Sequence, residues 1–164
     1  MSGRAWKFGD NISTDEITPG RYMGLRSNIT ELAKHTLEDA RKEFPSSVRA
    51  GDFVVASKNF GMGSSREHAP IVIKTCGVTA VLAVSFARIF YRNAINIGLP
   101  AIACDTTMIN EGDELELNLS EGEVQNLTRR IKIHFPPMSR EMQVILSEGG
   151  LIAYVEKHGD LIFS

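Results

Sequence analysis

The chain has 164 residues, of which 43% are apolar and 23% charged, and its formal net charge is -2. This length and composition suit one globular domain with a hydrophobic core, and we treat residues 1–164 as a single domain. The near-neutral charge, without a basic stripe, excludes the counterion-release binding that nucleic acids require. No apolar leader and no run of roughly 20 apolar residues is present, so we expect a cytoplasmic protein without a membrane segment.

The first third of the chain predicts a strand, a long loop and a helical insert. Residues 4–8 have the pattern of a short strand, and turn-forming residues fill 9–20 almost continuously. Asn28 followed by Glu31 has the spacing of a helix start, and Phe44-Pro45 indicates the end of an insert over about residues 28–47.

The middle of the chain predicts an α/β core. Residues 53–56, 80–84 and 101–104 are short apolar runs without alternation, which is typical of parallel strands buried on both faces. Between them lie two segments with helical spacing. The first ends near Gly77, and the second runs from a capping Ser85 to Gly98.

Residues 113–164 predict an antiparallel hairpin followed by a terminal helix. Apolar residues alternate over 115–119 and 131–135, with a turn at Glu121-Gly122. Apolar spacing over 138–146 then indicates a helix that Gly149-Gly150 ends, with another turn or two beyond it. The predicted fold class is therefore α/β, with a mostly parallel central sheet plus an antiparallel hairpin.

The stretch from Asn59 to Pro70 carries the strongest functional signal. It places two glycines, two serines and an arginine between a buried strand and a helix, without the spacing of a dinucleotide-binding turn or a P-loop. Pro70 has no amide proton and so fits only the first helical turn, which places the N-cap no earlier than about Glu67. The serines then precede a helix N-terminus, where Arg66 can bind a carboxylate, so we expect a di- or tricarboxylate ligand.

Two other interpretations of this stretch stay open at the level of the residues. Ser64 or Ser65 could be a hydrolase nucleophile with His68 as base, but no Gly-x-Ser-x-Gly elbow or acid partner is identifiable. The serines could instead only cap the helix while Arg66 pairs with a surface acid. The two cysteines, Cys76 and Cys104, lie far apart in apolar runs and are interpreted as buried thiols, so we expect no metal site on this chain.

Three segments carry a resemblance to a known family. The run Gly63-Ser64-Ser65-Arg66-Glu67 resembles the motif of the swivelling domain of the aconitase superfamily. The early stretch of residues 9–22 resembles the Gly-Asp-Asn-Ile-x-Thr-Asp-x-Ile segment of the family. Residues 86–98 resemble its free-standing small-subunit form, as in isopropylmalate dehydratases, and the chain's length matches such a subunit.

The resemblance implies a swivelling β/β/α domain and a hydro-lyase that is active only with a large subunit. It implies that Ser64, as an alkoxide, removes the proton beside a carboxylate, and that Asp15 lies in the same catalytic site. Ser65, Arg66 and Thr14 would bind the substrate. The 4Fe-4S cluster would belong to the large subunit, because two distant cysteines cannot ligate it.

The resemblance also bears on the substrate. In such small subunits the residues after the tyrosine of the early segment face the variable side chain of the substrate, which here assigns Met23, Gly24 and Leu25 to a specificity loop and Arg26 to substrate binding. Apolar residues suit the isopropyl group of 2- and 3-isopropylmalate and thus a role in leucine biosynthesis, whereas an arginine suits an extra carboxylate. Homoaconitase and methylmalate or dimethylmalate dehydratase small subunits are the alternatives.

A protein of another class is the remaining rival, namely a non-enzymatic carboxylate-binding module. Neither the neutral charge nor the loop motif excludes simple ligand binding. Without its large subunit, the chain is also a candidate for self-association into a homo-oligomer.

Overall fold

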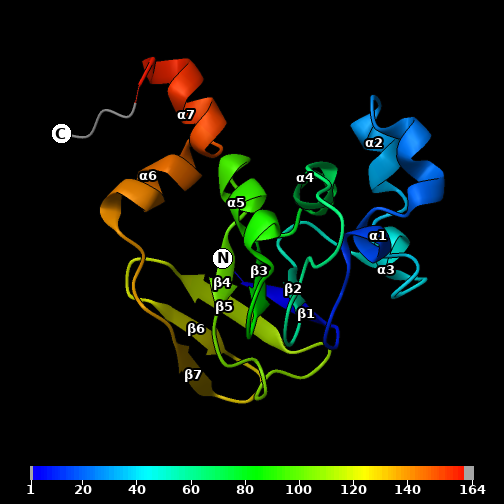
Figure 1. Cartoon of the computed structure of the whole chain (residues 1–164). Coiled ribbons are helices and arrows are strands. Elements are labelled where there is room, and N and C mark those ends of the chain that lie inside the picture. The colour runs from blue at the N-terminus through cyan, green and yellow to red at the C-terminus, as the bar shows by residue number, and fades with distance from the viewer. Residues whose placement is uncertain (1, 161–164) are drawn as a thin grey trace.

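The computed structural model describes residues 2–160, which build one curled seven-stranded sheet with helices packed against it (Figure 1). The strand order is β4-β3-β2-β1-β5-β6-β7. The strands are β1 (Ser2–Lys7), β2 (Phe53–Val55), β3 (Ala80–Ala83), β4 (Ala101–Ala103), β5 (Glu114–Asn118), β6 (Glu123–Asn126) and β7 (Ile131–His134).

Strand β1 joins a parallel part of the sheet to an antiparallel part. Its second half, Ala5 to Lys7, pairs with β2 in parallel, and β2, β3 and β4 continue in the same direction. Its first half, Ser2 to Arg4, pairs with β5 in the antiparallel sense. The predicted fold class is thus confirmed, but the antiparallel part has an additional strand. The 131–135 run pairs with β6, so the expected hairpin is a three-stranded meander.

The helices form three groups around the parallel strands (Figure 1). Helices α4 (His68–Thr75) and α5 (Arg88–Asn96) lie beside the parallel strands. A lobe on one side contains α1 (Thr14–Ile17), the 3-10 helix η1 (Gly20–Leu25), α2 (Ile29–Ala33) and α3 (Phe44–Ser47). On the other side, α6 (Arg140–Ser147) and α7 (Leu151–His158) contact each other, and α7 contacts α5.

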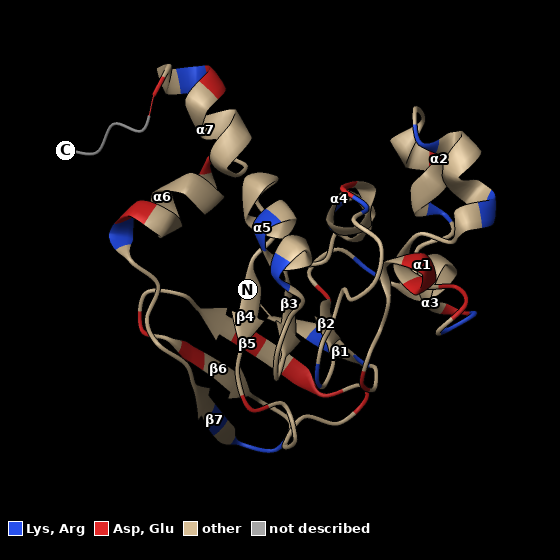
Figure 2. Ribbon diagram, in the orientation of Figure 1, with Lys and Arg blue, Asp and Glu red and all other residues tan. Residues whose placement is uncertain are grey.

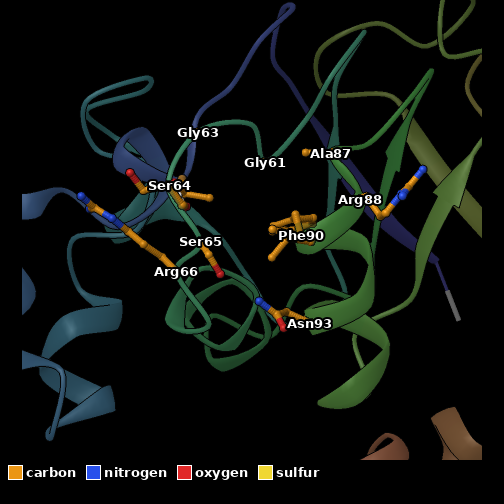
Figure 3. A pocket seen from close by; sticks show the side chains of 11 residues that line it. Gly61, Gly63, Ser64, Ser65, Arg66, Ala87, Arg88, Phe90 and Asn93 are labelled. Atoms are coloured by element: carbon orange, nitrogen blue, oxygen red, sulfur yellow. Dashed lines mark hydrogen bonds between the residues drawn. The ribbon is translucent and has the colours of Figure 1, made fainter.

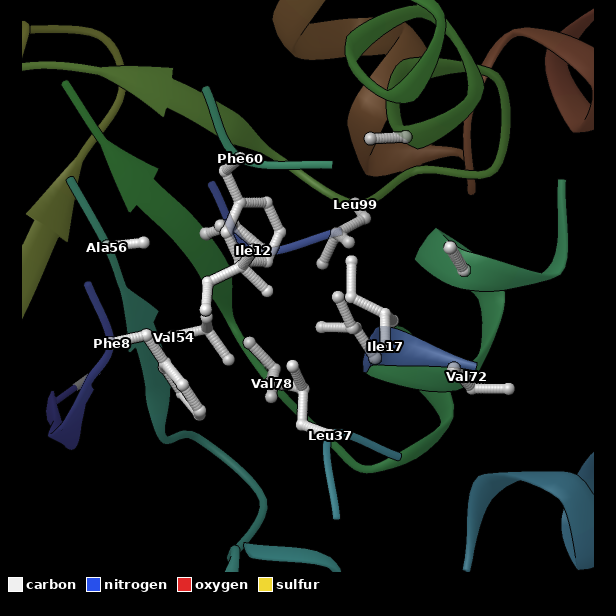
Figure 4. Packing of buried hydrophobic residues seen from close by; sticks show 14 of the residues in the cluster. Phe8, Ile12, Ile17, Leu37, Val54, Ala56, Phe60, Val72, Val78 and Leu99 are labelled. Atoms are coloured by element: carbon white, nitrogen blue, oxygen red, sulfur yellow. The ribbon is translucent and has the colours of Figure 1, made fainter. Parts of the chain in front are cut away.

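Two hydrophobic clusters cover the two faces of the parallel strands. Val54 and Ala56 point into one cluster with the helices (Figure 4), whereas Phe53 and Val55 point into the other. The antiparallel strands close the second cluster with Leu115, Val124 and Ile133, which explains why β2 and β3 show no alternation. Full burial of one such side chain stabilises the fold by about 1.5–3 kcal/mol.

Local signals set several helix ends as the sequence indicates, with two exceptions. Within the stretch predicted as a continuous loop, Ser13 and Glu16 form a capping box that starts the short helix α1. Asn28 caps α2 by accepting a hydrogen bond from the backbone N–H of Glu31, and α4 begins after Glu67 as Pro70 requires. Ser85 does not cap a helix: its Oγ accepts a hydrogen bond from the backbone N–H of Asn59 at 2.8 Å. Helix α5 therefore begins later, at Arg88, without a side-chain cap.

Lys, Arg, Asp and Glu residues are spread along helices, strands and loops rather than confined to one element (Figure 2). Within residues 2–160, no helix has the length and apolar character needed to cross a membrane.

Candidate active site

Three segments meet at the edge of the sheet where β1, β2 and β3 end. They are the early loop (residues 9–20), the serine loop (residues 59–67) and the first half of α5. Backbone hydrogen bonds join them, from Gly61 N to Ile12 O at 2.7 Å and from Ala87 N to Phe60 O at 2.9 Å. The carboxyl ends of parallel strands commonly carry the ligand site of α/β proteins, so this edge is the first place to seek one.

Glycine is required at position 61 for the serine loop to approach α5. Gly61 has φ +84°, and a Cβ there would lie 2.3 Å from Cγ of Phe90. Any larger residue would push the loop away from the helix. The close contact between Gly61 and Phe90 therefore fixes the distance between the two walls of the site.

A pocket of about 210 Å³ lies between the serine loop and α5 (Figure 3). One wall comes from the early and serine loops and the other from the start of α5. The lining residues are Thr14, Gly61, Gly63, Ser64, Ser65, Arg66, Ala87, Arg88, Ile89, Phe90 and Asn93.

Ser64 and Ser65 are exposed at the pocket, and neither hydroxyl has an intramolecular hydrogen bond within the described part of the chain. The loop itself is held in place by Thr14, whose buried hydroxyl donates to the carbonyl oxygen of Ser64 at 2.7 Å. In Figure 3 the Ser65 hydroxyl points toward Asn93, whereas the Ser64 hydroxyl points to the opposite side, where the Arg66 guanidinium also extends. Both hydroxyls remain available to a ligand.

Arg66 is held by the early loop. Its Nη1 lies 3.1 Å from Oδ1 of Asp15 and donates to the carbonyl oxygen of Thr18. The same Asp15 oxygen accepts a hydrogen bond from Gly20 N at 3.0 Å. Because the Asp15 side chain is 64% exposed, this ion pair adds little to stability, and its effect is to orient the guanidinium. The structure thus brings together Thr14, Asp15, Ser64, Ser65 and Arg66, all of which the sequence assigned to one site.

The segment assigned to specificity lies beside this group but outside the pocket lining. Met23, Gly24 and Leu25 belong to η1, and Arg26 follows it, donating from Nη1 to the carbonyl oxygen of Met23 at 3.0 Å. The start of η1 is adjacent to the site, since a Cβ on Gly20 would lie 3.5 Å from Nη2 of Arg66.

Contacts with the helical insert fix η1 from its other side. The Tyr22 ring stacks on His35 with a centroid distance of 3.6 Å, and Arg21 pairs with Glu38 and Asp39. The insert therefore determines where the Met23–Leu25 stretch lies.

The start of α5 contributes residues to the pocket that reasoning from the sequence did not place. Arg88, Ile89, Phe90 and Asn93 line it, although Arg88 points away in Figure 3. The available signal was positional: α5 follows β3 just as α4 follows β2, so both helices begin at the same edge of the sheet. A polar Asn93 on a helix with an apolar inward face was the second signal.

Residues 2–160 hold no group of three or more His, Cys, Asp or Glu side chains placed to bind a metal ion. Cys76 packs against the helix-side cluster and Cys104 against the other, so the sheet separates them. Burial raises the pKa of both thiols, that of Cys104 to about 11, whereas metal ligation requires thiolates.

Comparison with known proteins identifies the family of the chain. The Aconitase C-terminal domain family matches residues 11–106, which include the early loop, the serine loop and α5. The chain is 63% identical over 161 residues to a 3-isopropylmalate dehydratase small subunit 2 of Archaeoglobus fulgidus, covering 98% of each chain. It is 56% identical over 160 residues to the small subunit 1 of Thermotoga maritima, covering 97% of this chain and 96% of the relative.

A solved structure supports the same assignment. The crystal structure of a 3-isopropylmalate dehydratase from Methanocaldococcus jannaschii superimposes with a TM-score of 0.89 at 46% identity, covering 96% of this chain and 94% of that one. The chain belongs to the aconitase C-terminal domain family. Within that family, its end-to-end relatives are 3-isopropylmalate dehydratase small subunits, a class of hydro-lyase subunit.

Proposed function

We propose that this chain is the small subunit of a 3-isopropylmalate dehydratase, which interconverts 2- and 3-isopropylmalate by dehydration and rehydration. The observation that carries the proposal is the serine loop, whose unpartnered Ser64 and Ser65 hydroxyls and oriented Arg66 face one open pocket. End-to-end similarity to small subunits of that name supports the same reaction.

In the proposed reaction Ser64 is the base. As an alkoxide, it takes the proton from the carbon beside a substrate carboxylate, and the electrons of that C–H bond form the double bond as hydroxide leaves. Rehydration returns the proton from Ser64 to the product. A serine hydroxyl is a weak acid near neutral pH, so its surroundings must stabilise the alkoxide.

The N-terminus of α4 alone cannot supply that stabilisation. A helix terminus contributes up to about 2 kcal/mol, and one pKa unit corresponds to about 1.4 kcal/mol, so the dipole lowers a pKa by little more than one unit. The Arg66 charge, the free N–H groups of the serine loop and the exclusion of water must provide the rest. The pocket is open on this chain, so exclusion of water requires a covering subunit.

Arg66 and Ser65 are the proposed carboxylate ligands. A guanidinium carries five N–H donors, and the contacts to Asp15 and Thr18 occupy only Nη1. The remaining donors can bind a carboxylate in the bidentate geometry that arginine favours. Asp15 would then keep the guanidinium in place between turnovers.

The iron–sulfur cluster of this reaction is proposed to lie on a large partner subunit. Cys76 and Cys104 do not fit a cluster, because the sheet separates them and burial disfavours both thiolates. The cluster would assist the loss of hydroxide from the partner's side, while this chain handles the proton and a carboxylate.

The face around the pocket is the proposed docking surface for that partner. Ile89 lines the pocket and is 51% exposed, and the exposed apolar residues Val84 and Tyr91, at 37% and 39%, belong to the same stretch of chain from the end of β3 to α5. A subunit covering them would also close the pocket and remove water from the serines.

Isopropylmalate is the proposed substrate, since the relatives are named for it and the half-buried Met23 would offer an apolar surface to an isopropyl group, whereas Leu25 packs against the helix-side core. The alternative acids, homoaconitate and the methylated malates, remain comparison substrates. Arg26 would serve an extra carboxylate only after releasing the carbonyl oxygen of Met23.

The test is hydration of 2-isopropylmaleate by this chain reconstituted anaerobically with its cognate cluster-bearing subunit. Citraconate and homoaconitate serve as comparison substrates, and each subunit alone serves as a control. We expect turnover only with both subunits and the highest kcat/KM for isopropylmaleate. Binding of all three acids without turnover would support the carboxylate-binding module, and a preference for homoaconitate would reassign the substrate.

A further inference from the structure

Helix α5 carries one polar side chain on a face that is otherwise apolar. Phe90 and Ala94 on this face are buried, and Ile97 packs against the same cluster. Asn93 lies among them, one turn from Phe90, and is half-buried at the pocket. An amide in such a place loses water contacts, which costs free energy unless it gains a hydrogen-bond partner.

The Asn93 side chain has no such partner within residues 2–160, and its backbone carbonyl accepts a hydrogen bond from Ile97 N at 3.3 Å at the end of the helix. In Figure 3 its amide points into the pocket toward Ser65. Asn126 gives the contrast, because its buried Nδ2 donates to Oδ2 of Asp113 at 2.8 Å and to the carbonyl oxygen of Met108 at 3.2 Å. Asn126 supports the fold, whereas Asn93 is open to the pocket.

We propose that Asn93 is a further substrate-binding residue, whose Nδ2–H donates to an oxygen of the carboxylate that Ser65 binds from the opposite wall. This inference rests on the proposed function. The role of Asn93 as a donor follows from the other residues on the α5 side of the pocket. The side chains of Ala87, Ile89 and Phe90 offer no donor, and Arg88 points away. Asn93 is then the donor that α5 supplies to the pocket, and an anionic oxygen is the ligand that uses it best.

The experiment compares Asn93→Ala, Asn93→Asp and a control, Asn96→Ala, in the reconstituted two-subunit enzyme with isopropylmaleate. Asn96 lies on the same helix, three residues further on and outside the pocket lining. Removing one hydrogen bond to a charged group should raise KM about 10- to 100-fold in Asn93→Ala, with affinity for the large subunit unchanged. Asn96→Ala should stay within about twofold of wild type.

Asn93→Asp separates binding from support of the fold. A carboxylate at position 93 would repel the substrate carboxylate, so the KM of Asn93→Asp should exceed that of Asn93→Ala. This KM should fall as the pH is lowered toward the ordinary Asp pKa of about 4, because protonation removes the repulsive charge. A wild-type KM in both variants, or a loss explained by a lower Tm or weaker subunit association, would overturn the proposal. If the wild-type pair shows no turnover, the proposed function fails, and calorimetric titration with isopropylmalate on the same variants still tests Asn93.

Discussion

Polar side chains at the two ends of the parallel strands differ in whether they have hydrogen-bond partners within the fold. At the amino edge, buried Asp52 accepts hydrogen bonds from Arg4 N, Trp6 Nε1 and Arg49 N, at 3.1, 3.0 and 2.9 Å. At the carboxyl edge, Ser64 and Ser65 have no side-chain partner in the described part of the chain. Buried Asp52 has its partners within the fold, as buried polar groups normally do, whereas the exposed serine hydroxyls are open to solvent and so to a ligand.

The largest expected effect is on turnover, at the carboxyl edge. Ser64→Ala should lower kcat of the reconstituted enzyme by about 10²–10⁴-fold, the range for loss of a positioned base. Its Tm should stay close to that of wild type, because the Ser64 hydroxyl has no partner to lose. Steady-state kinetics and thermal unfolding on the same preparation check both, and a variant that keeps a tenth of the activity would contradict the role of Ser64.

The next effect is on stability, at the amino edge. Asp52→Ala leaves three donors unpaired, including the buried indole N–H of Trp6, and should lower the free energy of unfolding by about 3 kcal/mol or more. Exposed Glu116 on β5 provides the matched control, since Glu116→Ala should change stability by less than about 0.5 kcal/mol. Urea unfolding measures both. An Asp52→Ala protein as stable as wild type would contradict the structural role of Asp52.

A smaller effect is expected where the early loop meets the serine loop. Asp15→Asn keeps an oxygen for Gly20 N but removes the charge that faces Arg66. A less firmly oriented guanidinium should bind the carboxylate less well and raise KM by about threefold to tenfold, with an unchanged Tm. A lowered kcat at constant KM would show instead that Asp15 acts on the reacting atoms.

The last prediction concerns thiol reactivity, which bears on neither edge of the sheet. Burial raises the pKa of Cys104 to about 11, with the negative charge of Asp105 as a second cause. In a Cys76→Ser background, alkylation of the native chain by iodoacetamide at pH 8 should be about 100-fold slower than after unfolding, because two pKa units separate native and unfolded thiols.

The same shift gives a pH dependence of stability. The folded-state pKa lies above the unfolded value, so the stability that the protonated thiol contributes is present below about pH 9 and lost as the pH rises toward 11. In the alkylation experiment, labelling of the native chain at pH 8 as fast as that of the unfolded chain would contradict the raised pKa and show that Cys104 is a reactive thiol.

Reasoning from the sequence found most of the fold because its signals were local. Apolar runs without alternation identified β2 and β3, Asn28 and Glu31 identified the start of α2, and Pro70 identified the start of α4. Strand β6 was missed because its four residues include only one buried apolar side chain, Val124, which is too few for a pattern. Ser85 misled because a serine before a helical pattern resembles a cap, whereas its hydroxyl binds the backbone of a distant loop.

In the candidate site, too, the segments with local motifs were predicted, whereas the features that depend on tertiary contacts were not. The serine loop and early loop were singled out by their residues, and their meeting in one site was implied by the family resemblance. Asn93 could not be placed, because the packing of α5 against Gly61 is a tertiary contact that no local pattern encodes. The position of η1 depends in the same way on the stacking of Tyr22 on His35 in the insert.

The most direct test of the central claim is a competition measurement. The large subunit is held limiting with wild-type chain, and increasing Ser64→Ala chain is added while hydration of isopropylmaleate is followed. If the fold and docking surface are independent of the Ser64 hydroxyl, the variant binds the large subunit normally and turnover falls in proportion to its share of the small subunit. Turnover that does not fall would mean that the variant is active or does not assemble, and either result would contradict the account.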